Sequence, residues 1–378
     1  MEIPIYLDYN ATTPIDREVA QEMKQFIDSH FGNPSSSYTI GRFNKDAIRL
    51  ARNQVADLIN ANPDEILFTS CATESNNLAI WGVLKGKQGK HIITSAIEHP
   101  AIIEVCRHLE TQGYEITYIP VDKFGSVNPQ DVENAIRPDT SLITIMHANN
   151  EVGTIQPISE IAAIAKKHKV IFHTDAAQSV GKIETDVSKL GVDLLTIAGH
   201  KLYAPKGIGA LYVKNGVEIQ NIMFGANQEK GIRPGTENVI HIVALGKACE
   251  IAKRDFDKNS QNMLSMRDSL LNGLKKNLGE QVKVNVNLQK CLPNTLSVAF
   301  DKVDAHTLAS VISKDICIST GSACHADSIE ISSVLKAMNI NIKTAAGTVR
   351  ISTGKYTTSD EIDSTIEIIS KTILKLNH

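Results

Sequence analysis

The sequence has few of the features that mark a secreted, membrane-bound or zinc-binding protein. Its six cysteines form no Cys-x-x-Cys pair, and Cys317 and Cys324 lack the spacing of metal ligands. We therefore expect no metal site and no disulfide framework, which favours a reducing cytoplasm. The N-terminus (residues 1–6) does not read as a signal peptide, and no segment approaches the roughly 20 apolar residues of a membrane helix.

The chain also lacks a strong net charge. Its formal charge is −3, so we expect no direct nucleic-acid binding and no attraction to anionic membranes. Apolar residues make up 42% of the chain and charged residues 21%, a balance typical of a globular protein. With 378 residues, the chain is long enough for two sizeable hydrophobic cores.

Short apolar segments alternate with helical patterns from about residue 64 to 214. This alternation predicts an α/β fold with a mostly parallel sheet that is covered by helices on both faces. The expected helices include Pro100–Thr111 and Pro157–His168. The expected strands are Ile66–Thr69, His91–Ser95, Glu115–Ile119, Leu142–His147, Val170–Thr174, Leu194–Ala198 and Gly209–Val213.

The pattern changes after about residue 256, which indicates a smaller α+β domain. We expect a large domain over residues 15–255 and a small domain formed by residues 1–14 and 256–378. Its expected helices are Ser260–Asn277, Ala305–Ser313, Ser332–Met338 and Ser359–Leu376, and its expected strands are Val282–Val286, Thr295–Phe300 and Thr348–Ser352.

Polar side chains follow five of the expected strands in the large domain. They are Thr73, His99, Asn149, Asp175 and Lys201. Ligands of parallel sheets bind beyond the carboxyl ends of the strands, so we expect these residues to meet at one site.

Lys201 and Asp175 are a pair of residues that pyridoxal 5′-phosphate (PLP) requires. A lysine forms a Schiff base with this cofactor, and a carboxylate pairs with its pyridinium nitrogen. The lysine must then have a lowered pKa through burial or a nearby cation. Taken singly, Asp175 reads as a helix cap and Lys201 as a solvated loop lysine. Their combination favours the cofactor site.

Other residues in these junctions suit the rest of the cofactor. The segment that contains Thr73 joins a strand to a helix, where amides and a hydroxyl bind phosphate, although an ordinary helix cap has the same pattern. His99 suits stacking on the ring and proton transfer, and His200 suits the phosphate or proton transfer. Gln178 and Asn149 suit the phenolic oxygen of PLP, and Asn149 also suits a substrate carboxylate.

Cys324 and Arg350 are candidates for the substrate side. Cys324 lies among small residues that suggest a mobile loop, and His325 would help to ionise its thiol; a small buried cysteine is the alternative. Arg350 suits a carboxylate bound by two parallel hydrogen bonds, and a surface ion pair is its alternative.

In order and spacing, the motifs resemble the cysteine desulfurases of the NifS/IscS type, which are class V aminotransferase-like PLP enzymes of fold type I. The resemblance covers essentially the whole chain. It rests on residues 6–14, 31–36, 72–76, 173–178, 200–201, 233–238 and 322–324.

The resemblance implies a reaction and a role for each residue. The enzyme would convert L-cysteine to L-alanine and leave a persulfide on Cys324, from which a sulfur-acceptor protein of an iron–sulfur cluster or thiolation pathway takes it. Lys201, Asp175 and His99 would bind the ring, with Lys201 and His99 also catalytic. Asn149 and Arg350 would orient the substrate carboxylate. The phosphate would contact Ala72, Thr73, His200 and, from the partner subunit of a homodimer, Thr236.

Three departures from the family pattern stand out. Ala198 occupies a position where many members have a serine that binds the phosphate, so PLP would bind more weakly unless Thr236 and the backbone compensate. Ala226 and Asn227 replace glycines, which puts the local backbone conformation in question. Residues 323–327, 233–238 and 197–201 also resemble selenocysteine lyases.

Three alternatives to a cysteine desulfurase therefore stay open. The first is a selenocysteine lyase on the same fold. The second is a non-catalytic scaffold, since fold alone does not give function. The third is an aminotransferase, in which Cys324 would have no role.

Overall fold

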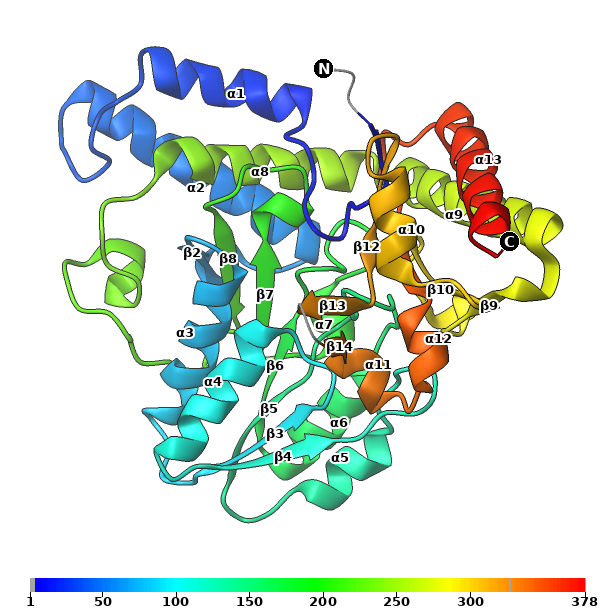
Figure 1. Cartoon of the computed structure of the whole chain (residues 1–378). Coiled ribbons are helices and arrows are strands. Elements are labelled where there is room, and N and C mark those ends of the chain that lie inside the picture. The colour runs from blue at the N-terminus through cyan, green and yellow to red at the C-terminus, as the bar shows by residue number, and fades with distance from the viewer. Residues whose placement is uncertain (1–3, 326–327, 378) are drawn as a thin grey trace.

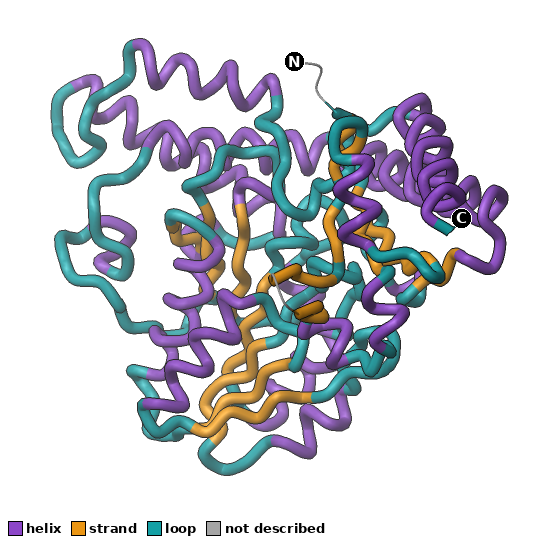
Figure 2. The backbone as a smooth tube through the Cα atoms, viewed as in Figure 1, coloured by secondary structure: helices purple, strands orange, loops and turns teal. Residues whose placement is uncertain are grey.

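The structure, a computed structural model, describes residues 4–325 and 328–377, without the side chains of residues 322–330. Helices lie on both sides of the central strands, and a second group of helices and strands packs at one end (Figures 1 and 2). The main helices are α1 (Arg17–Asp28), α2 (Thr39–Ile59), α3 (Ala72–Leu84), α4 (Pro100–Thr111), α5 (Pro129–Ala135), α6 (Ile158–His168), α7 (Val187–Leu190), α8 (Val239–Arg254) and α9 (Phe256–Leu278). Towards the C-terminus follow α10 (Ala305–Ile312), α11 (Ser333–Ala337), α12 (Ile342–Ala346) and α13 (Ser359–Leu376).

The central sheet of the described chain has seven strands in the order β2-β8-β7-β6-β5-β3-β4. Only β8 runs antiparallel to its neighbours, which confirms the expected α/β fold with a mostly parallel sheet. Its strands are β2 (Ile66–Thr69), β3 (His91–Ser95), β4 (Glu115–Ile119), β5 (Thr140–Thr144), β6 (Ile171–Asp175), β7 (Leu194–Ala198) and β8 (Gly209–Val213).

Alternate side chains of the sheet enter two different hydrophobic clusters. Leu67 of β2 packs with α3 and α4, whereas its neighbours Ile66 and Phe68 pack on the opposite face. This division follows from the two-residue period of a strand. Apolar residues in both registers of each strand therefore produce a sheet that is buried on both faces.

A second sheet and a third hydrophobic cluster lie beyond α8. The strands β9 (Val282–Val284), β10 (Thr295–Phe300), β12 (Ser319–Thr320) and β15 (Thr348–Ser352) pair in the order β12-β15-β10-β9. Helices α9, α10 and α13 contribute to the same cluster. The first strand, β1 (Ile5–Tyr6), pairs with β11 (Ile316–Cys317), so the N-terminal segment joins this C-terminal part of the chain.

Several boundaries differ from those expected. The strand expected at Leu142–His147 is β5, which begins and ends earlier; the segment after it turns back, and the N–H of Gln156 donates to the backbone oxygen of His147 (2.9 Å). The long helix expected from Ser260 already begins at Phe256. The expected loop around Cys324 contains two short paired strands, β13 (Ser322–His325) and β14 (Ser328–Ile331), with Cys324 opposite Ile329.

Candidate active site

A cavity of about 470 Å³ opens at the carboxyl ends of the central strands. Asp175 is the last residue of β6, and Lys201 ends a 3₁₀ turn that follows β7 directly. Helix α3 begins at Ala72 after β2, and His99 caps α4 after β3. These strand ends lie at one edge of the sheet, so the topology alone brings the four junctions to one cavity.

Asp175 is buried in the wall of this cavity. Its Oδ2 accepts a hydrogen bond from Asn76 Nδ2 (2.7 Å), and its Oδ1 accepts one from the backbone N–H of Ala177 (2.9 Å). The second bond holds a turn rather than the helix cap that was the alternative role, because no helix begins after β6 until Val187, and Asp175 lines the cavity as well. Asn76, which lies one turn into α3, was not singled out from the sequence.

Lys201 lies opposite the first segment of the chain. Its Nζ donates to the backbone oxygens of Asn10 and Ala11. Burial, with a smaller contribution from Arg350 and against opposing effects of Asp8 and Asp175, lowers the pKa of Lys201 to about 8. The lysine thus has the lowered pKa that a nucleophilic amine requires.

The N-terminus of α3 provides unoccupied amide donors at one end of the cavity. Its N-cap residue Cys71 forms no side-chain hydrogen bond to the first turn, and Thr73 places a hydroxyl on the same wall. The nearby carboxylate of Glu74 is neutralised by Arg233 (2.7 Å). This end therefore suits an anion. Ala198 lines it without a hydroxyl group.

Two imidazoles line the cavity in their neutral form. His200 Nδ1 lies 3.1 Å from Thr12 Oγ1, and burial lowers the pKa of His200 to about 4. His99 Nδ1 accepts from the backbone N–H of Ala101 (3.1 Å), which places the ring proton on Nε2. Burial also lowers the pKa of His99, against an opposing effect of Asp175.

The structure corrects the expectation for Asn149. This side chain is fully buried: its Nδ2 donates to Ile97 O (2.9 Å), and its Oδ1 accepts from the N–H groups of Glu151 and Val152. It has no polar atom left for a ligand and does not line the cavity. The adjacent residue Asn150 lines it instead. The motif of two adjacent asparagines was recognised from the sequence. A turn decides which of the two faces the cavity, and the sequence pattern does not specify that turn.

Arg350, in β15, is held by a network that closes the cavity from the second sheet. Its Nη2 donates to Asp8 Oδ1 (2.6 Å) and Ser319 Oγ (2.7 Å), and its Nη1 donates to Asn150 O (3.0 Å). Its buried Nε has no partner among the described residues. Arg350 is thus a half-buried cation whose Nε–H is a spare donor, rather than the surface ion pair considered above.

The structure describes Thr236 fully but not the side chain of Cys324. Thr236 is exposed and does not line the cavity. The side chain of Cys324 lies outside the described residues, as do residues 326–327 of the same motif. The chain that leads to Cys324, residues 319–321, lines a second cavity of about 1150 Å³ that shares Asn150 and Arg350 with the first.

The substitution of glycines by Ala226 and Asn227 causes no strain at these two positions. Asn227 has a φ of −86°, and the positive φ angles fall on Glu229 and Lys230 instead. Glu229 is held by Arg52 (2.5 Å) and by the backbone N–H of Phe68 (2.8 Å). These bonds fix the unusual backbone conformation without a glycine.

The described residues fit PLP. Two groups that the cofactor requires, a buried carboxylate and an amine of lowered pKa, face one cavity. The first residues of α3 line the same cavity, and so does the imidazole of His99. Lys201, Asp175, His99, Thr73 and His200 would hold the group.

Comparison with known proteins agrees with this arrangement. The model of the family "Aminotransferase class-V" matches residues 5–365. The cysteine desulfurase IscS of Dictyoglomus turgidum is 46% identical over 379 residues, which cover 100% of this chain and 96% of that protein.

Two solved structures extend the comparison. A NifS-like protein superposes with a TM-score of 0.93 at 38% identity, covering 99% of this chain and 100% of its own. SspA in complex with cysteine gives a TM-score of 0.83 at 38% identity, covering 94% of this chain and 100% of its own. This chain belongs to the aminotransferase class-V family and, within it, to the cysteine desulfurases.

Proposed function

We propose that this chain binds PLP and converts L-cysteine to L-alanine, leaving a persulfide on Cys324. The observation that carries the proposal is the meeting of Asp175 and Lys201 at one cavity, with the pKa of Lys201 lowered to about 8. When bound, PLP withdraws electrons from the substrate through its protonated ring.

The chain's own residues account for binding and proton transfer. Asp175 would keep the ring nitrogen protonated, because a buried carboxylate favours the charged form of a cationic partner. Lys201 anchors the cofactor and then moves protons at the substrate Cα. His99, with its proton on Nε2, stacks on the ring and serves as a second proton donor.

The substrate carboxylate is assigned to Arg350, with Asn150 in place of Asn149. Arg350 has an unpartnered Nε and can exchange its bond to Asp8 for one to the substrate. In the sulfur step, the thiolate of Cys324 forms an S–S bond while the Cβ–S bond of the substrate breaks. The Cβ of the substrate gains a proton. The products, alanine and the Cys324 persulfide, then contain the same atoms as the reactants, cysteine and the Cys324 thiol.

We also propose the surroundings of this reaction. Thr236 of a second copy reaches the phosphate, so the active form is a homodimer. A sulfur-acceptor protein of an iron–sulfur cluster or thiolation pathway removes the persulfide, in the cytoplasm. No helix in the described part of the chain is long and apolar enough to span a membrane.

Two measurements test the function. Borohydride fixes a lysine–PLP bond, and peptide mass mapping should then find the label on Lys201. Alanine formation from cysteine should depend on Cys324 and be lost in Cys324→Ala. Retained cysteine activity in that variant would overturn the persulfide step, and activity with selenocysteine alone would identify a selenocysteine lyase.

A further inference from the structure

We propose that Lys182 is a positioning residue that fixes the side-chain amide of Gln178 with its nitrogen towards the cofactor. The inference rests on the proposed function, because Gln178 matters through the phenolic oxygen of PLP. Lys182 does not line the cofactor cavity, and by this proposal it does not contact the reacting atoms.

Lys182 lies one turn after Gln178, in the turns that follow β6. Its side chain is buried, and its Nζ donates to Gln178 Oε1 (3.1 Å) and to Asn10 Oδ1 (3.3 Å). Gln178 Nε2 in turn donates to the backbone oxygen of Asn10 (3.0 Å). That oxygen also accepts from Lys201, so the amide nitrogen lies beside the lysine that would anchor PLP.

The direction of the Gln178 amide follows from the chemistry of its partner. An ammonium group has donors only, so the atom of Gln178 that faces it must be the oxygen. The amide nitrogen is then left to donate to the opposite side, where Lys201 and the cavity lie. A phenolate oxygen of the cofactor needs such a donor, and a reversed amide would present an acceptor instead.

The ammonium form of Lys182 enforces this orientation, and the neutral amine can maintain it. Burial, with smaller contributions from Lys201 and Arg350, lowers the pKa of Lys182 to about 7. The neutral amine still has two N–H groups, which equals its two acceptors, Asn10 and Gln178. The amide orientation therefore persists across neutral pH.

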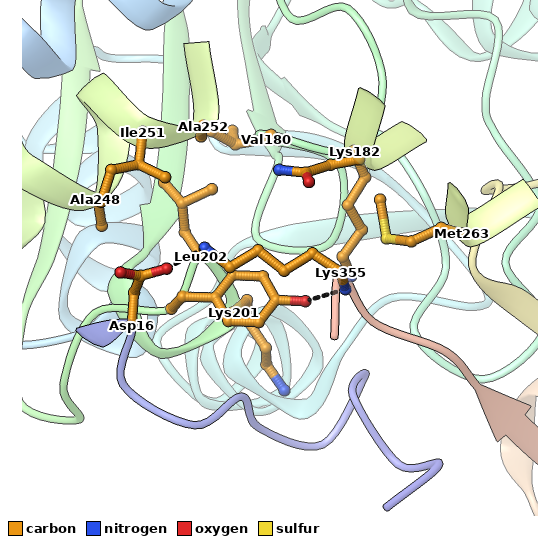
Figure 3. A pocket seen from close by; sticks show the side chains of 13 residues that line it. Asp16, Val180, Lys182, Lys201, Leu202, Ala248, Ile251, Ala252, Met263 and Lys355 are labelled. Carbon is orange, nitrogen blue, oxygen red and sulfur yellow. Dashed lines mark hydrogen bonds and ion pairs between the residues drawn. The ribbon is translucent and has the colours of Figure 1, made fainter. Parts of the chain in front are cut away.

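Other charged groups surround the same region. Figure 3 shows Lys182, Lys201, Lys355 and Asp16 around a small cavity beneath the site. Asp175 and Arg350 face the cofactor cavity, which Gln178 also lines. Lys355 is neutralised by its ion pair with Asp16, whereas Lys182 has no carboxylate partner among the described residues. A buried amine without an ion pair is costly, which points to a role other than stability.

Lys182→Met tests the proposal because it removes the donor and keeps an unbranched side chain of similar length. A hydrogen bond to the charged phenolate oxygen favours that form, so loss of the donor should raise the pH at which the visible PLP band titrates. We expect an upward shift of about one pH unit, equivalent to a tenfold change in proton affinity. Gln178→Ala should give the same shift, and the double variant should shift no further.

Two further variants separate positioning from a general structural role. Lys355→Met removes another lysine that lines the same small cavity but has no hydrogen bond to Gln178, and it should lower stability while the band titrates as in the wild type. Lys182→Gln keeps an N–H donor and should shift the band less than Lys182→Met. If Lys182→Met does not fold, the titration of the PLP band in Lys182→Gln tests the proposal instead.

The outcomes separate the role of Lys182 from the proposed function. An unshifted titration in Lys182→Met, or shifts that add in the double variant, would overturn the role of Lys182 while the PLP site stands. A wild-type protein that binds no PLP at Lys201 would instead overturn the proposed function itself.

Discussion

The two walls of the cavity are built in different ways. On the wall formed by the central sheet, each functional residue ends a buried strand, as Asp175 does, or lies within a few residues after one, as Lys201 does. On the opposite wall, Arg350 is positioned by Asp8, Ser319 and Asn150, which come from three distant segments. The first wall is set by local strand–helix junctions, whereas the second exists only after the segments have assembled.

Under the proposed function, the first wall would bind the cofactor and the second would bind the substrate. Variants on the first wall should therefore change the spectrum of bound PLP. Variants on the second wall should change reaction with cysteine while the spectrum stays the same.

The largest expected effect is on the first wall. Lys201→Ala should abolish both the visible PLP band and desulfurase activity, because no other described residue of the cavity is an amine. Absorption spectra and alanine formation provide the measurement. An unchanged spectrum would remove Lys201 from its assigned role.

Cys324→Ala should separate the two walls most clearly. Alanine formation from cysteine should fall to background, since no thiolate accepts the sulfur, while the PLP band should remain at wild-type strength. Cys106→Ala, at a buried cysteine distant from the cavity lining, is a matched control that should keep activity. Loss of the band in Cys324→Ala would contradict the separation.

Arg350→Ala should raise KM for cysteine by about 10- to 100-fold, because one charge-assisted hydrogen-bonded pair to a carboxylate contributes roughly 1.5–3 kcal/mol. Steady-state kinetics measure the effect, and the PLP spectrum should not change. Arg254→Ala, on the surface, is the control. A wild-type KM would place the substrate carboxylate elsewhere.

The rate at which the apo-protein binds PLP should rise with pH and level off above about pH 8. Burial lowers the pKa of Lys201, so the neutral, nucleophilic amine becomes the major form above about 8. Below that pH the rate should fall by about tenfold per unit, because each unit protonates most of the remaining amine. A rate that is flat between pH 6 and 8 would contradict this pKa.

The smallest expected effect concerns the missing hydroxyl at the phosphate end. Ala198→Ser should tighten PLP binding by about two- to tenfold, equivalent to one net hydrogen bond of roughly 0.5–1.5 kcal/mol. Equilibrium titration of the apo-protein measures this change. Unchanged affinity would mean that the other phosphate contacts already compensate.

Much of the first wall could be predicted from sequence, because its signals are local. Apolar strands followed by Asp175 or Lys201 place the side chains at one sheet edge whatever the rest of the chain does. Asn149 was misplaced because one residue of register is decided by a turn. Lys182 and Asp8 escaped notice because their partners, Gln178 with Asn10 and Arg350, become neighbours only in the folded chain.

The sequence by itself determined the α/β fold, the family and the candidate lysine, since strand periodicity and the order of motifs are properties of the chain. Only the tertiary structure decided which asparagine faces the cavity, which carboxylate holds Arg350 and which amine orients Gln178. Burial and hydrogen bonding between distant segments set these choices, and a linear pattern does not encode the distances on which both depend.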